Sequence, residues 1–252
     1  MLKVENLTSG YLKKYDVIND ISFNLDHGNV GVIIGENGSG KSTIFKTILG
    51  FIKPKCGSIL VDDIDIVNLS SKKRATLVAY VSQNVYMPEL TVFDVISMGL
   101  IPYYNFNLTK DNKDEILEII KEFNLEDIAY KNANELSGGE KQIVAIARAI
   151  AQKPKVLIFD EPTSNLDVVN EMLLQDKIIE ISKKKNICIL LSLHNLNLAY
   201  DIGDKFIFIK DGSVIASGDK EAFNEENLSK TFNKKCSIVR QGEDLYVKFI
   251  KE

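Results

Sequence analysis

The 252-residue sequence predicts an α/β fold, with a central, mostly parallel β-sheet and an inserted helical segment. Three wholly or mainly apolar runs of strand length, "VGVII" at 30–34, "VLIF" at 156–159 and "ICILL" at 187–191, are typical of buried parallel strands. Helical spacing of apolar residues dominates the stretch between the first two runs. We therefore expect a sheet-based core that is interrupted once along the chain.

The first sixty residues also predict strands that are not part of the parallel core. "LKVENL" (2–7) and "VINDISFNL" (17–25) place apolar residues on one face and polar residues on the other. The run 41–50 predicts a helix that ends at Gly50. Short strands follow at 58–61 and 77–83. We expect an N-terminal antiparallel β region beside the main sheet.

From about residue 91 the apolar spacing becomes helical, as in the run Ile116, Ile119, Ile120 and Phe123. Strand patterns return after Gln152, with helices near 168–184 and from 195, and a hairpin that turns on Asp211 and Gly212. We find no internal repeat and no flexible linker. The expected organisation is one domain over 1–252, in which 1–90 and 153–252 form a core lobe and 91–152 form a helical lobe.

Composition narrows the class of protein. The net charge of −4 and the pI near 5.4 show no basic footprint for nucleic acid. The three cysteines form no CxxC pair, which disfavours a disulfide framework or a zinc site. No apolar run reaches the length that crosses a bilayer, so we expect a soluble or peripheral protein.

Residues Gly35 to Ser42 match the phosphate-binding pattern G-x-x-x-x-G-K-[ST], after an apolar strand and before a helix. Backbone N–H groups from Gly38 to Lys41 are expected to bind the β-phosphate of a nucleotide, Lys41 to neutralise β/γ oxygens, and Ser42 to ligate Mg²⁺. The predicted binding loop comprises Gly35, Glu36, Asn37, Gly38, Ser39, Gly40, Lys41, Ser42 and Thr43.

Two carboxylates follow the apolar run at 156–159, at the end of its predicted strand. Asp160 is expected to hold Mg²⁺, and Glu161 to act as the general base that activates the attacking water. An apolar strand that ends in Asp-Glu is common by itself. Together with the phosphate-binding loop it predicts nucleotide hydrolysis.

A second glycine-rich segment, "LSGGE" at 136–140, directly precedes a helical pattern and has the features of an anion site. With the phosphate-binding loop, Gln83, "LIFDEPTSNLD" and His194, the chain resembles the nucleotide-binding subunits of ATP-binding-cassette (ABC) transporters over nearly its whole length. The resemblance implies that two subunits stack head to tail. In such a dimer the signature residues Ser137, Gly138 and Gly139 contact the ATP held by the partner's loop.

The same resemblance implies roles for single residues. Tyr11 matches the aromatic residue that stacks on adenine, although an exposed tyrosine at a strand end is the alternative. Gln83 matches the glutamine that contacts Mg²⁺ and the lytic water, and His194 the histidine that contacts the γ-phosphate. Asp167 matches the loop near the partner's phosphates. ATP and Mg²⁺ are therefore the expected cofactors.

The implied partners are a second copy of the chain, an integral membrane permease and, indirectly, an extracytoplasmic substrate-binding protein. The resemblance places the chain itself at the cytoplasmic face of the membrane, and it implies no nucleic-acid partner. "TVFDVISMGLIPYYNF" and "HNLNLA" resemble the subunits that serve iron–siderophore, haem and cobalamin importers. Molybdate, zinc and manganese importers, or a soluble cassette ATPase such as that of iron–sulfur assembly, are the alternatives. The residues expected to line a permease-docking groove, or else to lie in the core, are Tyr86, Met87, Tyr103, Tyr104 and Phe106.

Overall fold

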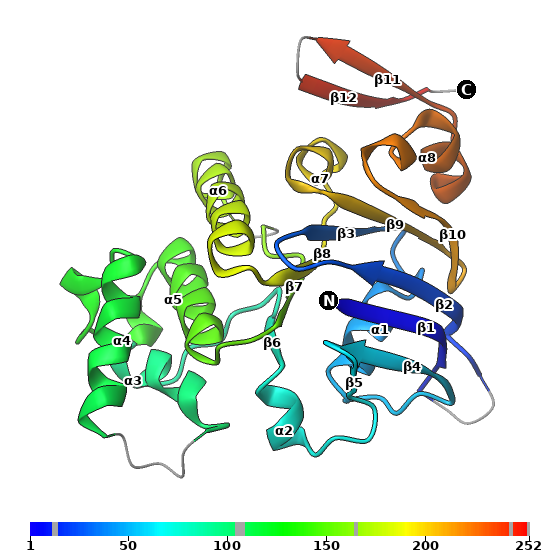
Figure 1. The fold of residues 1–252 in the computed structure, drawn as a ribbon. Coiled ribbons are helices and arrows are strands. Elements are labelled where there is room, and N and C mark those ends of the chain that lie inside the picture. The colour runs from blue at the N-terminus through cyan, green and yellow to red at the C-terminus, as the bar shows by residue number, and fades with distance from the viewer. Residues whose placement is uncertain (12–14, 104–108, 164–165, 242–243, 251–252) are drawn as a thin grey trace.

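The computed structural model describes residues 1–11, 15–103, 109–163, 166–241 and 244–250. Within these ranges six strands form the central sheet, in the order β10-β9-β3-β8-β7-β6, and all neighbours except β10 and β9 pair in parallel. The strands are β3 (Val30–Ile34), β6 (Val78–Val81), β7 (Val156–Asp160), β8 (Cys188–Ser192), β9 (Lys205–Lys210) and β10 (Ser213–Gly218). The predicted mostly parallel sheet is confirmed (Figure 1).

The N-terminal antiparallel region is also confirmed. Its described strands are β1 (Leu2–Ser9), β2 (Ile18–Leu25), β4 (Cys56–Val61) and β5 (Ile64–Asp65), in the order β2-β1-β4-β5. In β2, Ile18 and Ile21 are both buried although they lie three residues apart. The register shifts there, and Asp20 has a φ of +50°, so a β-bulge restores both side chains to the same face.

The described residues contain eight α-helices. They are α1 (Lys41–Ile48), α2 (Ser71–Ala75), α3 (Val92–Ser97), α4 (Lys110–Glu122), α5 (Gly138–Ala151), α6 (Val168–Lys185), α7 (Leu196–Ile202) and α8 (Glu225–Phe232). Short 3₁₀ turns are η1 (Met98–Leu100), η2 (Glu126–Ile128), η3 (Ala133–Glu135) and η4 (Lys220–Ala222).

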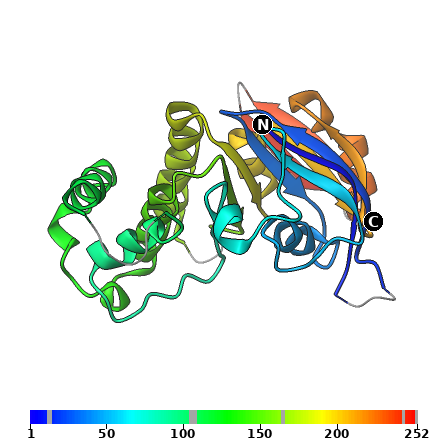
Figure 2. The same ribbon diagram turned by 60° about the horizontal axis from the view of Figure 1, so that its bottom comes forward.

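Alternate residues of one strand serve two separate cores. Val156 and Ile158 of β7 pack with α1 and the antiparallel sheet, whereas Leu157 and Phe159 pack with the helices on the other face. Both faces of the parallel strand are thus buried, which explains why its sequence is continuously apolar. Figure 2 shows α1 beside the strands of the N-terminal region.

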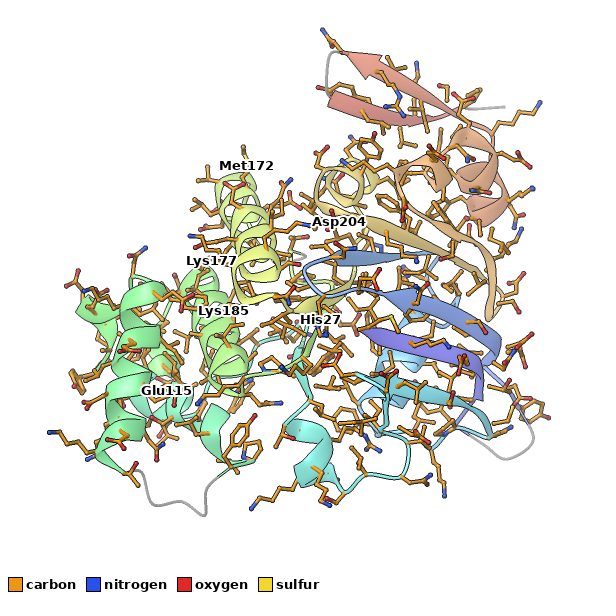
Figure 3. The ribbon with its side chains drawn as sticks, viewed as in Figure 1. His27, Glu115, Met172, Lys177, Lys185 and Asp204 are labelled. Carbon is orange, nitrogen blue, oxygen red and sulfur yellow. The ribbon has the colours of Figure 1, made fainter. Side chains whose placement is uncertain are left out.

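Helices α3, α4 and α5 lie together at one side of the molecule, beyond β6 (Figure 1). Lys185 of α6 forms an ion pair with Glu122 of α4 at 2.9 Å, and Lys177 Nζ donates to the Glu122 carbonyl at 3.3 Å. Figure 3 shows both lysines on α6. Because α3, α4 and α5 are grouped in this way, we propose that residues 91–152 form a helical lobe.

The C-terminal segment forms a hairpin of β11 (Cys236–Gln241) and β12 (Asp244–Phe249), which is not among the elements predicted from the sequence. It packs on α7, with Leu245 buried and the Arg240 guanidinium donating to the Tyr200 hydroxyl at 3.2 Å. Among the described residues, no helix has both the length and the apolar character needed to cross a bilayer.

Candidate functional site

The phosphate-binding loop joins β3 to α1 and needs glycine at two left-handed positions. Gly38 has a φ of +82° and Gly40 a φ of +111°, a region that residues with a Cβ rarely adopt. A Cβ on Gly40 would also lie 2.7 Å from Ile18 Cγ2, whereas one on Gly38 would meet nothing within 4 Å. The loop is therefore packed closely against β2 at Gly40 and open at Gly38.

Lys41 is the first residue of α1 and is only 6% exposed. Its Nζ donates to the carbonyls of Gly35 at 2.8 Å and Glu36 at 3.1 Å, so the side chain folds back along the loop. Burial lowers the pKa of Lys41, and the nearby carboxylates of Glu161 and Asp160 oppose that shift. A cation is thus held beside the loop that is predicted to bind phosphates.

The loop borders a cavity of about 290 Å³. Its lining consists of residues between β1 and β2, of the loop and α1, and of the residue after β7: Tyr11, Val17, Asn37, Gly38, Gly40, Lys41, Ser42, Thr43 and Glu161. Ser39 is a buried residue of the loop, and its carbonyl accepts from the Gly212 N–H at 3.1 Å. Most of the predicted loop residues thus surround one concave site.

The three predicted catalytic residues meet at the carboxyl ends of neighbouring strands. Gln83 Nε2 donates to Glu161 Oε2 at 2.8 Å, and His194 Nε2 lies 2.7 Å from Glu161 Oε1. Gln83 follows β6, Glu161 follows β7 and His194 follows β8, and these strands are adjacent and parallel. The sheet therefore brings together residues that are far apart in the sequence.

Asp160 ends β7, and its Oδ1 accepts a hydrogen bond from Ser192 Oγ at 3.0 Å. Burial, with the Asp160 charge, raises the pKa of the neighbouring Tyr80 to about 12. Among the described residues, no group of three His, Cys, Asp or Glu side chains could hold a metal by itself. Oxygen donors from Ser42 and Asp160 still fit Mg²⁺, which takes one or two protein oxygens together with phosphates and water.

The signature residues lie elsewhere. Ser137 caps α5: Glu140 N donates to Ser137 Oγ at 3.3 Å, and Ser137 Oγ and N donate to Glu140 Oε2 at 2.7 and 2.8 Å. These bonds from Ser137 lower the pKa of Glu140. A Cβ on Gly138 would meet nothing within 4 Å, and none of the signature residues lines the described cavity. The N-terminus of α5 is open and separate from the chain's own phosphate-binding loop.

Asp167 stands next to this helix end. It caps α6, and its carboxylate accepts from Asn170 N at 2.9 Å and Asn170 Nδ2 at 2.8 Å, which lowers the pKa of Asp167. A Cβ on Gly139 would lie 3.2 Å from Asn170 Oδ1. The starts of α5 and α6 thus form one continuous surface.

Tyr11 is 58% exposed at the cavity, and Lys46 Nζ donates to its hydroxyl at 3.3 Å. Of the residues predicted for a docking groove, Tyr86 is exposed, whereas Met87 is buried and belongs to the core. Tyr103 donates to the Gln152 carbonyl at 2.9 Å. Tyr104 and Phe106 lie outside the described residues.

Two residues at the site were not found from the sequence. Val17 lines the cavity but carries no chemical signal. Ser192 binds Asp160, and its signal is a single hydroxyl at the end of an otherwise apolar strand.

The family match and the similar proteins all point to the same family. The family described as "ABC transporter" matches residues 18–164. An uncharacterized ABC transporter ATP-binding protein of Methanocaldococcus jannaschii is 39% identical over 251 residues, which cover 100% of this chain and 95% of that protein. A probable siderophore transport system ATP-binding protein of Bacillus subtilis is 30% identical, covering 95% of this chain and 88% of its own. The phosphonates import ATP-binding protein of Fusobacterium nucleatum is 34% identical, and the match covers 92% of this chain and 98% of that protein.

Solved structures agree with the sequence relatives. An inward-facing, putative metal-chelate type ABC transporter superimposes with a TM-score of 0.82 and 26% identity, covering 99% of this chain and 96% of that one. The structure described as a dimeric bacterial ABC transporter cassette gives a TM-score of 0.76 and 28% identity, covering 88% of this chain and 100% of the other. The chain belongs to the ABC transporter family and is its ATP-binding, ATP-hydrolysing cassette.

Proposed function

We propose that the chain is the ATPase subunit of an ABC importer, that it dimerises around two ATP molecules, and that it powers uptake of a metal chelate. The observation that carries the catalytic part is the meeting of Gln83, Glu161 and His194 beside the cavity of the phosphate-binding loop. A loop that binds phosphates next to a positioned carboxylate has the components of a nucleotide hydrolase.

In this proposal the loop N–H groups and the start of α1 bind the phosphates of ATP, and Lys41 neutralises their charge. Glu161 accepts a proton from water as the water oxygen bonds to the γ-phosphorus and the bond to the β–γ bridging oxygen breaks. Gln83 orients that water, and His194 contacts the γ-phosphate. Tyr11 stacks on the adenine.

Ser42 and Asp160 would hold Mg²⁺, with Gln83 contributing when nucleotide is present. When bound, the ion neutralises charge on the phosphate oxygens. The support is the oxygen donor set at the cavity and the fixed carboxylate of Asp160.

A second copy of the chain supplies Ser137, Gly138 and Gly139 to each ATP, with Asp167 near the partner's loop. The open end of α5, outside the described ATP cavity, supports this arrangement. The dimeric cassette structure supports it by similarity. Permease subunits would dock on the helical lobe near Tyr86 and Tyr103, which places the cassette at the cytoplasmic face of the membrane. A substrate-binding protein would deliver the chelate outside.

The substrate class rests on the segments 91–106 and 194–199 and on similarity to a siderophore-system ATPase and a metal-chelate type transporter. The phosphonate importer subunit, at 34% identity, favours a second candidate, an anionic phosphonate. In this proposal the permease and the substrate-binding protein contact the cargo, so transport by the assembled complex separates the two candidates.

A transport assay separates these candidates. The chain is co-expressed with permease and binding-protein candidates from the same genome, and the assembled complex is reconstituted in proteoliposomes. ATP-dependent uptake of a ferric siderophore, absent in the Glu161→Gln complex, supports the proposal. Uptake of a phosphonate but not of the chelate overturns the substrate class. If the chain hydrolyses ATP but forms a complex with none of the permeases tested, the importer assignment is overturned.

A further inference from the structure

Ser192 is a fully buried polar residue at the last position of β8, a strand that is otherwise apolar. Burying a hydroxyl costs free energy unless it is hydrogen-bonded, so an alanine would serve better if only packing mattered. The parallel register of β7 and β8 sets Ser192 opposite Asp160. The serine therefore lies where the two strands carry their polar residues.

The Ser192 hydroxyl makes two hydrogen bonds to consecutive residues. Its Oγ donates to Asp160 Oδ1 at 3.0 Å and accepts from the backbone N–H of Glu161 at 3.2 Å. A serine hydroxyl has one donor and can accept at its lone pairs, so both bonds form at once. One side chain thus orients the predicted metal carboxylate and the backbone of the predicted base.

The bond to Glu161 acts at a strained point of the chain. Glu161 has a φ of +50°, which is unfavourable for a residue with a Cβ and is retained only where neighbouring contacts fix it. This turn directs the Glu161 side chain to Gln83 and His194. His194 follows Ser192 by two residues, so the same strand end supports both the turn and the histidine.

We propose that Ser192 is a positioning residue for ATP hydrolysis: it holds the Asp160 carboxylate in the orientation that receives Mg²⁺ and keeps Glu161 turned toward its catalytic partners. This inference rests on the proposed roles of Asp160 and Glu161. It predicts that removing the hydroxyl impairs Mg²⁺-dependent steps while nucleotide binding without metal persists.

The test compares Ser192→Ala and Ser192→Thr with Ser182→Ala. Ser182 is an equally buried serine on α6 whose Oγ donates to the Ile187 carbonyl at 3.2 Å, so its loss controls for a buried hydroxyl remote from the site. Two quantities are measured: the Mg²⁺ concentration for half-maximal ATPase activity, and binding of a fluorescent ATP analogue with Mg²⁺ and in EDTA. Thermal unfolding of each variant reports on folding.

Ser192→Ala should raise the required Mg²⁺ concentration and lower kcat, each by roughly tenfold, the scale of a lost hydrogen bond to a charged group. Binding of the analogue in EDTA should match the wild type. Ser192→Thr keeps the hydroxyl and should recover most of the Mg²⁺ dependence. Ser182→Ala should keep the wild-type Mg²⁺ dependence even where its unfolding temperature falls.

An unchanged Mg²⁺ dependence in Ser192→Ala overturns the inference, as do equal losses in Ser192→Ala and Ser182→Ala that follow their unfolding temperatures. Asp160→Asn separates this failure from failure of the metal assignment. If Asp160→Asn leaves the Mg²⁺ dependence unaltered, the proposed role of Asp160 fails. If Asp160→Asn raises the required Mg²⁺ concentration or removes the Mg²⁺-dependent activity, while Ser192→Ala leaves the Mg²⁺ requirement unchanged, only the role of Ser192 fails.

Discussion

The imidazole Nε2 of His194 lies 2.7 Å from Oε1 of Glu161, and Gln83 Nε2 binds the other oxygen of the same carboxylate at 2.8 Å. The two partners follow β8 and β6, the strands on either side of β7. The carboxylate is therefore held from both sides by the strand order of the sheet. The pairing of these strands thus sets the orientation of the Glu161 carboxylate.

The first prediction concerns Glu161→Gln. Glutamine keeps the shape of the side chain but cannot accept the proton from water, so turnover should fall by about two to four decades while ATP binding persists. Steady-state phosphate release and a nucleotide-binding assay measure the two effects. Glu118→Gln, an exposed carboxylate change on α4, is the control. Wild-type turnover in Glu161→Gln would remove Glu161 from the role of base.

The second prediction concerns Tyr11, whose ring borders the cavity and whose hydroxyl accepts from Lys46. If the ring face stacks on adenine, Tyr11→Ala should raise the ATP concentration for half-maximal activity by about three- to tenfold. Tyr11→Phe should stay near the wild type because it keeps the ring. Equal effects of the two substitutions would instead assign the effect to the hydroxyl and its bond with Lys46.

The sequence predicts the parallel core well because strands buried on both faces carry continuous apolar runs. It also places Gln83 at the end of a predicted strand, and Glu161 and His194 just after apolar runs. The roles of Gln83 and His194 rest on family resemblance and that of Glu161 on its position after the strand, and all three stay predictions. At these positions a polar side chain stands at or just after the end of an apolar run, so both the strand end and the polar group can be read from the sequence. The proposed lobe boundaries at 91 and 152 likewise stay predictions.

Other features depend on contacts that no local pattern contains. Ser192 acquires its partners only through the pairing of β7 with β8, and Met87 is buried although it follows an exposed tyrosine. The bulge at Asp20 breaks the simple alternation expected for β2. The hairpin β11–β12 was missed because its inward residues are defined by packing on α7.

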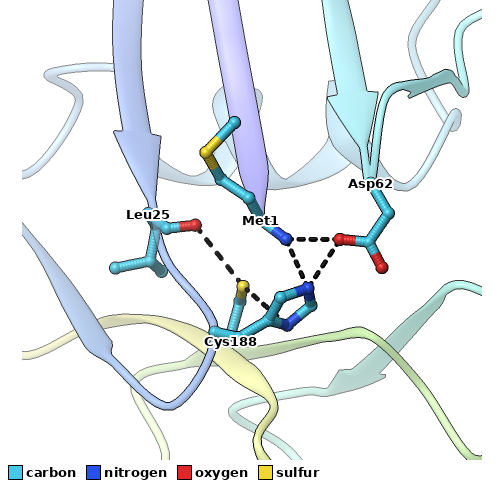
Figure 4. A network of polar contacts seen from close by, with 5 residues as sticks. Met1, Leu25, Asp62 and Cys188 are labelled. Atoms are coloured by element: carbon cyan, nitrogen blue, oxygen red, sulfur yellow. Dashed lines mark hydrogen bonds and ion pairs between the residues drawn. The ribbon is translucent and has the colours of Figure 1, made fainter.

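The third prediction concerns acid stability at the N-terminus. The Met1 ammonium contacts Asp62 Oδ1 and His27, and His27 Nε2 lies 2.6 Å from Asp62 Oδ1 (Figure 4). Burial alone would raise the pKa of Asp62, but the hydrogen bonds and charges of Met1 and His27 outweigh it, and the pKa is lowered. A carboxylate with a lowered pKa stabilises the fold above its unfolded pKa, near 4, and loses that effect as the pH falls through the folded value.

Asp62→Asn should therefore lower the unfolding temperature at pH 7, by the equivalent of at most about 1 kcal/mol because the pair is partly exposed. The difference from the wild type should shrink as the pH falls below about 4, the unfolded value, toward the lowered folded pKa. Asp62 and Asp63 both have positive φ, which asparagine tolerates, so Asp63→Asn tests the same turn without the ion pair. A difference between wild type and Asp62→Asn that is constant from pH 7 to pH 3 would contradict the electrostatic origin.

The last prediction concerns the two anion sites. Ser137 lies outside the described cavity that contains Lys41, and the start of α5 is open at Gly138. If this end binds the ATP of a second subunit, ATP contributes binding energy to the dimer that neither surface supplies alone. The Glu161→Gln protein should then elute as a dimer from a sizing column with ATP and as a monomer without it.

A substitution at the signature tests whether Ser137 carries that contact. Adding Ser137→Arg to Glu161→Gln should keep the protein monomeric with ATP, because a large side chain then occupies the helix end that receives the phosphate. ATP binding to the monomer should persist, since Lys41 and the phosphate-binding loop are intact.

Mixing the Lys41→Ala protein with the Ser137→Arg protein gives mixed dimers. In such a dimer both substitutions fall in one of the two shared ATP sites, and the other site is intact. Partial recovery of activity in that mixture supports sites shared between subunits, whereas a Glu161→Gln protein that stays monomeric with ATP at high concentration contradicts them.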